Sequence, residues 1–188
     1  PHVEVAVADP VTGEVLHGDA EGELLVRGPG VFAGYFRQDD STCQVLRSGS
    51  LATGDLVHRD SEGYFRIVDR LKDIFISGGE NVAPAEVESV LFSHPAVADV
   101  SVVGVPDDRW GEVGVAWVVA RVGVATDETD LLNFCGASLA RFKVPHHVRF
   151  VSVIPRTSSN KAMRRLLLQN WLAEQPDQPE PIEQTEHT

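Results

Sequence analysis

Three short stretches of the 188-residue chain carry residues whose types and spacing could do chemistry. In the first, Thr53-Gly54-Asp55, a carboxylate follows a glycine turn. Such a carboxylate can accept two hydrogen bonds from a vicinal diol, as acidic residues do on ribose. An aspartate that caps its own turn is the alternative. The tripeptide alone does not choose between a ribose site and a plain turn.

The second stretch, residues 69–84, has the sequence D-R-L-K-D-I-F-I-S-G-G-E-N-V-A-P. Its order predicts a charged joint, a short strand, a glycine turn and a helix start, because proline suits the first helical position. Glycine lets the backbone approach a ligand closely or take a positive φ. An ordinary β-turn would also explain Gly78-Gly79.

The third stretch, residues 155–165, contains Lys161 followed by two arginines. It predicts a polar loop that presents Lys161 at the start of a helix, where a cation is unfavourable against the helix dipole. A bound anion would relieve that repulsion, whereas a solvated basic face is the alternative.

Composition and motifs exclude several classes of protein. A net charge of −12 argues against nucleic acid or an anionic membrane as partner. No apolar run reaches membrane-spanning length, and no signal peptide opens the chain. Cys43, Cys135 and the histidines show no metal-ligand spacing, so no metal site is predicted. The common phosphate-loop motifs are missing, so a nucleotide enzyme would hold its triphosphate in a segment outside this chain.

The elements that must position these stretches change in type along the chain. The first 70 residues are predicted to be β-rich, with a turn at Glu21-Gly22, a short helix over residues 40–46 capped by Asp39 or Asp40, and a hairpin over residues 56–68. Mixed α/β structure is predicted after residue 72. Its expected helices are residues 85–93, 127–140 and 161–174, and its expected strands are residues 97–105, 113–122 (central and covered) and 148–154.

The order and spacing of these stretches resemble the AMP-forming acyl-CoA synthetases, adenylate-forming enzymes that include luciferases and nonribosomal peptide adenylation domains. The resemblance spans residues 1–174, and its most specific block is residues 69–88. It is also carried by Thr53-Gly54-Asp55, Pro155-Arg156-Thr157 with Lys161, residues 22–29, Gly34-Tyr35-Phe36, and Gly104-Val105-Pro106-Asp107 with Trp110-Gly111-Glu112.

The resemblance implies an α+β fold in two parts. Residues 1–71 would be the distorted β-barrel end of a large N-terminal domain, and residues 72–174 a small, mobile, mixed α/β C-terminal domain. Residues 175–188, which are acidic and contain three prolines, are predicted to be a disordered tail. The chain starts at Pro1 rather than Met, so we expect a piece of a longer protein that is inactive alone.

For the nucleotide, the resemblance implies three residues. Asp55 matches the aspartate that binds the ribose hydroxyls of ATP, and Arg70 matches an arginine near the same ribose. Lys161 matches the lysine that contacts carboxylate and phosphate during adenylation. A lysine suits that task because its compact charge can bridge two oxyanions.

For the second step, the resemblance implies a moving domain. Lys72 matches the hinge position. Gly78 and Gly79 match the loop that lines the pantetheine tunnel after rotation, and Trp110 and Phe142 match positions that lie near CoA in some relatives.

Three positions depart from the family pattern. Asn160 replaces the usual glycine before the lysine, and asparagine can also adopt the left-handed conformation. Val144 stands where some relatives place a basic residue that could meet CoA phosphate, and Ser50-Leu51-Ala52 replaces a common aromatic.

The implied reaction uses ATP, Mg²⁺ and coenzyme A, with a fatty or aromatic carboxylic acid as substrate, in the cytoplasm. The partner would be the missing N-terminal domain, which holds the acyl pocket. An enzyme that loads a carrier protein or makes acyl-adenylate only is an alternative, as is a non-catalytic module of the same fold.

Overall fold

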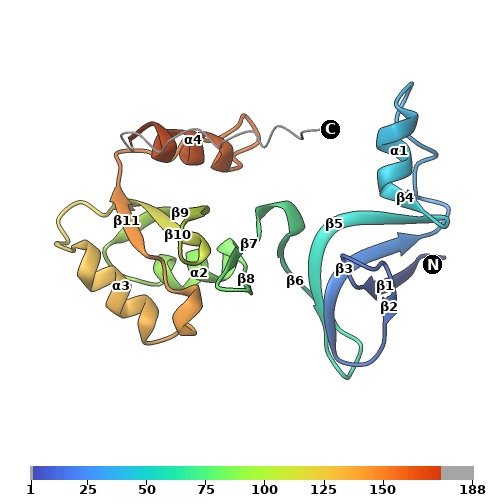
Figure 1. Ribbon diagram of the computed structural model, residues 1–188, viewed down its shortest axis with the longest axis horizontal. Helices are drawn as coiled ribbons and strands as arrows, with labels where there is room; N and C mark the ends of the chain where they lie inside the picture. The colour runs from blue at the N-terminus through green and yellow to red at the C-terminus, as the bar shows by residue number, and fades with distance from the viewer. Residues whose placement is uncertain (1, 175–188) are drawn as a thin grey trace, which may run out of the picture.

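The computed structural model describes residues 2–174, so the predicted acidic tail lies outside the described residues. The described chain forms two sheets in sequence order, with most helices around the second (Figure 1). The first sheet contains β1 (Glu4–Ala8), β2 (Val15–Leu16), β3 (Ala20–Arg27), β4 (Leu46–Arg47), β5 (Ser50–Arg59) and β6 (Phe65–Arg70). The second contains β7 (Phe75–Ser77), β8 (Glu80–Val82), β9 (Val97–Asp107), β10 (Gly111–Ala120) and β11 (His147–Phe150). The helical segments are α1 (Asp39–Val45), η1 (Leu71–Asp73), α2 (Pro84–Phe92), α3 (Glu128–Gly136), η2 (Arg141–Lys143) and α4 (Arg164–Glu174).

The first sheet is antiparallel, in the order β2-β1-β3-β5-β4, with β6 paired to β5. The β5–β6 pair confirms the predicted hairpin. Its turn is fixed by Asp60, whose Oδ1 accepts hydrogen bonds from the N–H groups of Glu62 and Tyr64, and by Gly63 at φ +88°. Turn chemistry that is local in sequence therefore placed this hairpin correctly.

The predicted turn at Glu21-Gly22 is wrong. Both residues lie inside β3, which runs unbroken from Ala20 to Arg27. A Cβ at Gly22 would overlap the carbonyl oxygen of Ala8 on the neighbouring β1. The glycine therefore marks a close approach of two strands rather than a change of direction.

The second sheet is covered on both faces, and its central strand is β10. It pairs with β11 in parallel and with β9 in antiparallel register, and Gly111 pairs with Ser77 of β7. Helices α2 and α3 pack on one face, where Val118 is buried, and α4 packs on the other, around Trp117. Two buried faces explain why residues 113–119 are almost continuously apolar. The α+β fold class predicted from the sequence is confirmed.

Two helix starts differ from expectation. Helix α1 has Gln38 at its N-cap without a side-chain cap, rather than Asp39 or Asp40, and it buries no residue. Helix α4 begins at Arg164, three residues after Lys161. The preceding loop instead closes on itself through a bridge between Arg156 and Ala162.

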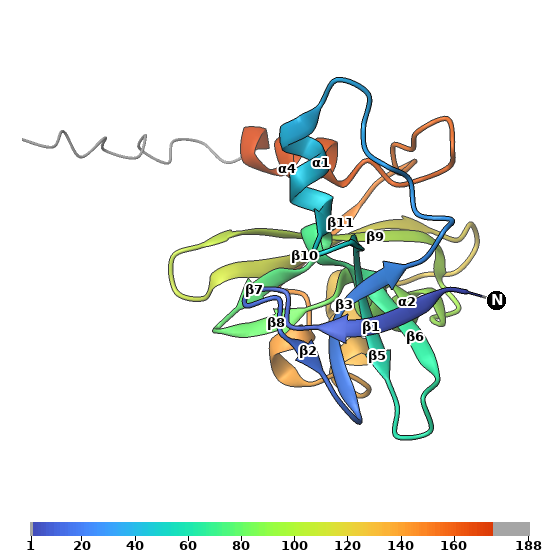
Figure 2. The same cartoon turned by 90° about the vertical axis from the view of Figure 1, so that its right-hand side faces the viewer.

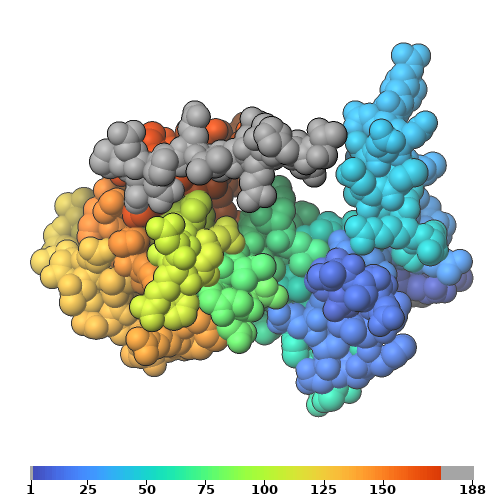
Figure 3. Space-filling model, in the orientation of Figure 1, coloured from blue at the N-terminus to red at the C-terminus, as the bar shows by residue number. Residues whose placement is uncertain are grey.

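The chain passes from one sheet to the other through η1. The blue and cyan half of the molecule lies beside the green-to-orange half in the space-filling view (Figure 3), and α1 stands away from the first sheet in both ribbon views (Figure 2). That this passage separates a large domain ending at residue 71 from a mobile domain of residues 72–174 stays a prediction. No helix within residues 2–174 is long and apolar enough to cross a membrane.

Candidate functional site

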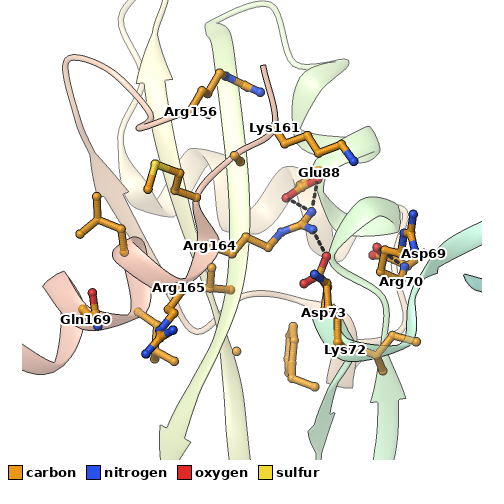
Figure 4. Close-up of a pocket in the computed structure, with 18 of the residues that line it drawn as sticks. Asp69, Arg70, Lys72, Asp73, Glu88, Arg156, Lys161, Arg164, Arg165 and Gln169 are labelled. Carbon is orange, nitrogen blue, oxygen red and sulfur yellow. Dashed lines mark hydrogen bonds and ion pairs between the residues drawn. The ribbon is translucent and has the colours of Figure 1, made fainter. Parts of the chain in front are cut away.

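A groove of about 1130 Å³ lies where η1, α2, β9 and the loop before α4 meet. It is lined by three of the predicted site residues, Arg70, Lys72 and Lys161 (Figure 4). Arg70 and Lys72 are neighbours in the sequence, whereas Lys161 is far from both, so the fold brings the charged joint and the lysine loop to one place.

Asp55 and Arg70 are joined at the first sheet. They face each other in the β5–β6 register, and Arg70 Nε lies 2.8 Å from Asp55 Oδ1. Arg70 Nη1 also donates to the carbonyl of Thr53 at 3.3 Å. The Thr53 hydroxyl, rather than the aspartate, accepts the bond from the Asp55 N–H at 3.1 Å. The Asp55 carboxylate is thus oriented by an arginine, and is not spent on capping its own turn.

The Lys161 side chain is exposed, and no ion pair within residues 2–174 holds it. Its backbone is fixed by two bonds to Thr157, whose N–H donates to the Lys161 carbonyl at 2.8 Å and whose Oγ1 accepts from the Lys161 N–H at 3.2 Å. Asn160 has φ +63°, which confirms that asparagine takes the left-handed conformation here. Lys161 is therefore a free cation on a well-defined loop.

Arg156 secures the other arm of this loop. Its guanidinium binds both carboxylate oxygens of Asp99 on β9, at 2.7 and 2.9 Å, and donates to the Asn160 carbonyl at 3.0 Å. Nη2 makes both bonds to Asp99, and Nη1 makes the bond to Asn160, so one guanidinium links the loop to β9. The loop is consequently anchored to the second sheet.

The contacts of Arg164 change the interpretation of the predicted anion site near Lys161. It begins α4, where its charge opposes the helix dipole. Its Nη2 binds both carboxylate oxygens of Glu88 at 2.8 and 2.9 Å, and its Nη1 binds Asp73 Oδ2 at 2.8 Å (Figure 4). Burial lowers the pKa of Arg164, but Glu88 and then Asp73 more than compensate, so the pKa is raised. The repulsion predicted near residue 161 is therefore relieved by carboxylates of the chain itself.

Lys72 lies exposed within η1. Its neighbour Asp73 is held by Arg164, so the segment just after the predicted hinge is tied to α4. Sequence reasoning missed Asp73, Glu88 and Arg164 as a unit. The only signal was the concentration of charges around each of them, which did not say which would pair.

Gly78 and Gly79 form the two-residue turn of the β7–β8 hairpin, at φ +61° and +88°. Positive φ at both positions is the type I′ geometry that suits the twist of a hairpin. The Gly78 N–H donates to the Trp110 carbonyl at 2.8 Å, and a Cβ at Gly78 would lie 2.9 Å from the indole ring. A Cβ at Gly79 would meet nothing within 4 Å. The structure thus brings Gly78 and Trp110 together, but neither glycine lines the groove.

Trp110 is held in place by Asp107, whose Oδ1 accepts from the N–H groups of Trp110 and Arg109 at 2.8 and 2.9 Å. These two bonds, that of Trp110 first, lower the pKa of Asp107. The Arg109 guanidinium lies over the indole, 4.7 Å from the ring centroid. Trp110 is 41% exposed, so this aromatic residue stays open to solvent beside the glycine turn.

Phe142 lies in η2, which contacts β8. The segment is tied to α2 by Lys143, whose Nζ lies 2.6 Å from Glu86 Oε2. Phe142 is 37% exposed and, like Trp110, lies outside the groove. Val144, the departure noted above, packs partly buried against the core instead of facing a ligand.

Known proteins match this chain over most of its length. Residues 86–161 match the AMP-binding enzyme C-terminal domain family. A 2-succinylbenzoate–CoA ligase from Bacillus cereus is 47% identical over 157 residues, which cover 84% of this chain and 32% of the ligase.

Two solved structures give the same picture. ATP-bound MatB from Rhodopseudomonas palustris is 38% identical with a TM-score of 0.85, over 91% of this chain and 34% of that one. The amide bond synthetase McbA from Marinactinospora thermotolerans is 39% identical with a TM-score of 0.84, over 91% and 35%. The chain spans about a third of the length of the relatives it matches. Residues 86–161 thus carry the AMP-binding enzyme C-terminal domain, and the chain as a whole is similar to the C-terminal portion of acyl-CoA ligases.

Proposed function

We propose that the chain is the C-terminal part of an ATP-dependent, AMP-forming carboxylic acid–CoA ligase. The observation that carries the proposal is the groove, in which the free cation of Lys161 faces the same space as Arg70, the partner of Asp55. A cation and an oriented carboxylate suit the phosphate and the ribose of one nucleotide.

In the first half-reaction, a substrate carboxylate oxygen attacks the α-phosphorus of ATP, and the bond to the leaving pyrophosphate breaks. Asp55 accepts hydrogen bonds from the ribose hydroxyls, Arg70 holds that carboxylate, and Lys161 offsets the negative charge shared by carboxylate and phosphate. Residues 2–174 contain no group of three side chains that could hold a metal. Mg²⁺ would enter bound to the phosphates of ATP, as this ion commonly does.

In the second half-reaction, the thiol sulfur of CoA attacks the acyl carbon, loses its proton, and displaces AMP. The proposal assigns the hinge to Lys72, so that residues 72–174 rotate as a domain and withdraw Lys161. The Gly78-Gly79 turn, with Trp110 and Phe142, would then line the path of the pantetheine chain. A side-chain-free turn beside an exposed indole leaves room for a thin ligand.

The aromatic class is the better supported of the two expected acid classes, because the similar ligase from Bacillus cereus acts on 2-succinylbenzoate. A fatty acid is the other class, and a cytoplasmic location is part of the proposal. A second acceptor has an observation in its favour, since the solved structure of the amide bond synthetase is as similar to this chain as that of MatB. In that case the adenylate would pass to an amine rather than to a thiol.

The test uses the full-length enzyme and measures the two half-reactions separately. Lys161→Ala should slow ATP–pyrophosphate exchange about 10²–10³-fold, the effect of removing one charge-stabilising group. Thioester formation from supplied acyl-adenylate should be largely preserved. Asn160→Gly is the matched control, because it keeps the charge and the left-handed turn, and it should leave both rates unchanged. Equal loss of both steps in Lys161→Ala would contradict the assigned role.

The complementary variant is Gly79→Leu, which should slow thioester formation while exchange continues. Intact CoA transfer in this variant would refute the tunnel assignment. Replacing CoA with an amine then identifies the acceptor.

A further inference from the structure

One hydrogen bond joins the two sides of the predicted hinge within residues 2–174, apart from the local bonds of η1. Asp69 Oδ2, on β6, accepts from the N–H of Ala85 on α2 at 2.8 Å. The other polar contacts of the groove stay on one side of Lys72: Arg70 pairs with Asp55 before it, and Arg164 pairs with carboxylates after it. A single carboxylate therefore carries the polar connection between the two parts.

Asp69 is firmly part of the first sheet. It lies opposite Leu56 in the β5–β6 register, and its side chain is buried, with the residue 8% exposed. Its second oxygen, Oδ1, accepts from the N–H of Arg70 at 2.7 Å. Both oxygens are thus engaged, and the carboxylate has a fixed direction at the end of β6.

Helix α2 depends on this carboxylate for its cap. The N-cap residue is Ala83, which has no side-chain acceptor, and Pro84 has no N–H group. The N–H of Ala85 is the first donor of the helix, and a carboxylate there also meets the positive end of the dipole. Helix α3, in contrast, is capped within its own unit by Asp127, which accepts from the N–H of Asp130 at 2.8 Å.

We propose that Asp69 is a positioning residue that holds residues 72–174 in the orientation in which Lys161 faces the groove. This inference rests on the proposed function. Asp69 stays with β6 during a rotation about Lys72, whereas Ala85 moves with α2, so the rotation must break their bond. The orientation that serves adenylation is then favoured by a helix cap, and the orientation that serves thioester formation is reached by releasing it.

The expected size of the effect follows from the free energy that one helix cap contributes. Loss of a helix cap corresponds to a shift of about fivefold in an equilibrium. If each half-reaction proceeds from its own orientation, Asp69→Ala should lower the ratio of the adenylation rate to the thioesterification rate about fivefold. Asp69→Asn should lower it as well, because two N–H groups point at the side chain and an amide has one accepting oxygen.

Asp127→Ala in the full-length enzyme is the matched control. It removes a cap of the same kind from α3, so it should reduce thermal stability as Asp69→Ala does while leaving the rate ratio unchanged. The inference is overturned if Asp69→Ala and Asp69→Asn slow both half-reactions equally, or if Asp127→Ala shifts the ratio to the same extent.

A second measurement does not depend on the activity. Spin labels placed on the exposed Cys43 of α1 and on Asn170→Cys of α4 report the distance between the two parts in the full-length protein, once other accessible cysteines are replaced. Asp69→Asn should transfer population from one distance to another, and Asp127→Ala should not. If Asp69→Asn leaves the distance distribution unchanged, the positioning role of Asp69 is refuted, even if the enzyme is active. If the distribution changes in an enzyme that has no exchange activity, only the proposed function is refuted.

Discussion

Replacing Arg164 by methionine tests whether the charge cluster of Arg164, Glu88 and Asp73 stabilises residues 72–174. Methionine keeps most of the length of the arginine side chain but removes its three hydrogen bonds to Glu88 and Asp73. The two carboxylates would then face the groove without their shared cation. Their side chains are 20% and 22% exposed, and that of Arg164 is 23% exposed, so water reaches them only in part.

The magnitude follows from this partial burial. Removing one partner of a fully buried pair costs about 3–5 kcal/mol, and exposed pairs contribute about 0–1 kcal/mol. The raised pKa of Arg164 shows that attraction by the carboxylates outweighs desolvation. Glu88 also keeps its bond from the Val102 N–H, at 2.8 Å, in the variant. We therefore expect a loss of about 2–3 kcal/mol, below the buried limit.

Urea unfolding of the chain measures this loss through its tryptophans. All three, Trp110, Trp117 and Trp171, lie after residue 72, so their fluorescence reports the second sheet and its helices. Arg165→Met is the matched control, since Arg165 is an exposed neighbour on the same helix without an ion pair among the described residues. A loss below about 1 kcal/mol, or a loss no larger than that of the control, would refute the reasoning.

Three further outcomes follow from two positions, Gly78 and Cys135. Gly78→Ala should slow CoA transfer and lower the unfolding midpoint, because φ is +61° and the new Cβ would press on the Trp110 ring; a midpoint equal to that of the wild type would contradict the close packing. Burial raises the pKa of Cys135 from 9.0 to about 11, so iodoacetamide at pH 8 should label Cys43 in the folded chain and Cys135 only after unfolding. Since the folded chain keeps the Cys135 proton longer than the unfolded chain, stability should fall as pH rises from about 9 to 11, and Cys135→Ala should remove that part of the fall.

Local chemistry made part of the fold predictable from the sequence. The hairpin of β5 and β6 follows from Asp60 and Gly63, the start of α2 from Pro84, and the turn before Lys161 from the left-handed tolerance of asparagine. Each of these features depends on residues within a few positions of one another. The turn predicted at Gly22 is wrong because the glycine is required by the close approach of Ala8 on another strand.

The candidate site is likewise predictable only where its residues lie close together in the sequence. The lysine loop could be expected from its sequence, but the contact of Arg164 with Asp73 spans 91 positions and that with Glu88 spans 76. No spacing rule pairs charges over such distances, so the sequence alone points to a balancing anion outside the chain, whereas the structure provides Glu88 and Asp73. The pairing of Asp55 with Arg70 depends likewise on the register of β5 and β6, which a hairpin prediction leaves open by a residue or two.

The glycine hairpin and the lysine loop are fastened to the same sheet. The hairpin is joined to the β9–β10 connection through the bond from Gly78 to Trp110, and to β10 through Glu112, which accepts from the Ile76 N–H. The loop is joined to β9 through Arg156. Because both are bonded to one sheet, the glycine hairpin and the lysine loop must move together when residues 72–174 rotate. Under the proposed function, access for ATP and access for the thiol become mutually exclusive settings of one angle. Selection on either half-reaction would then act on both, and only changes near the pivot could alter the balance without altering the surfaces themselves.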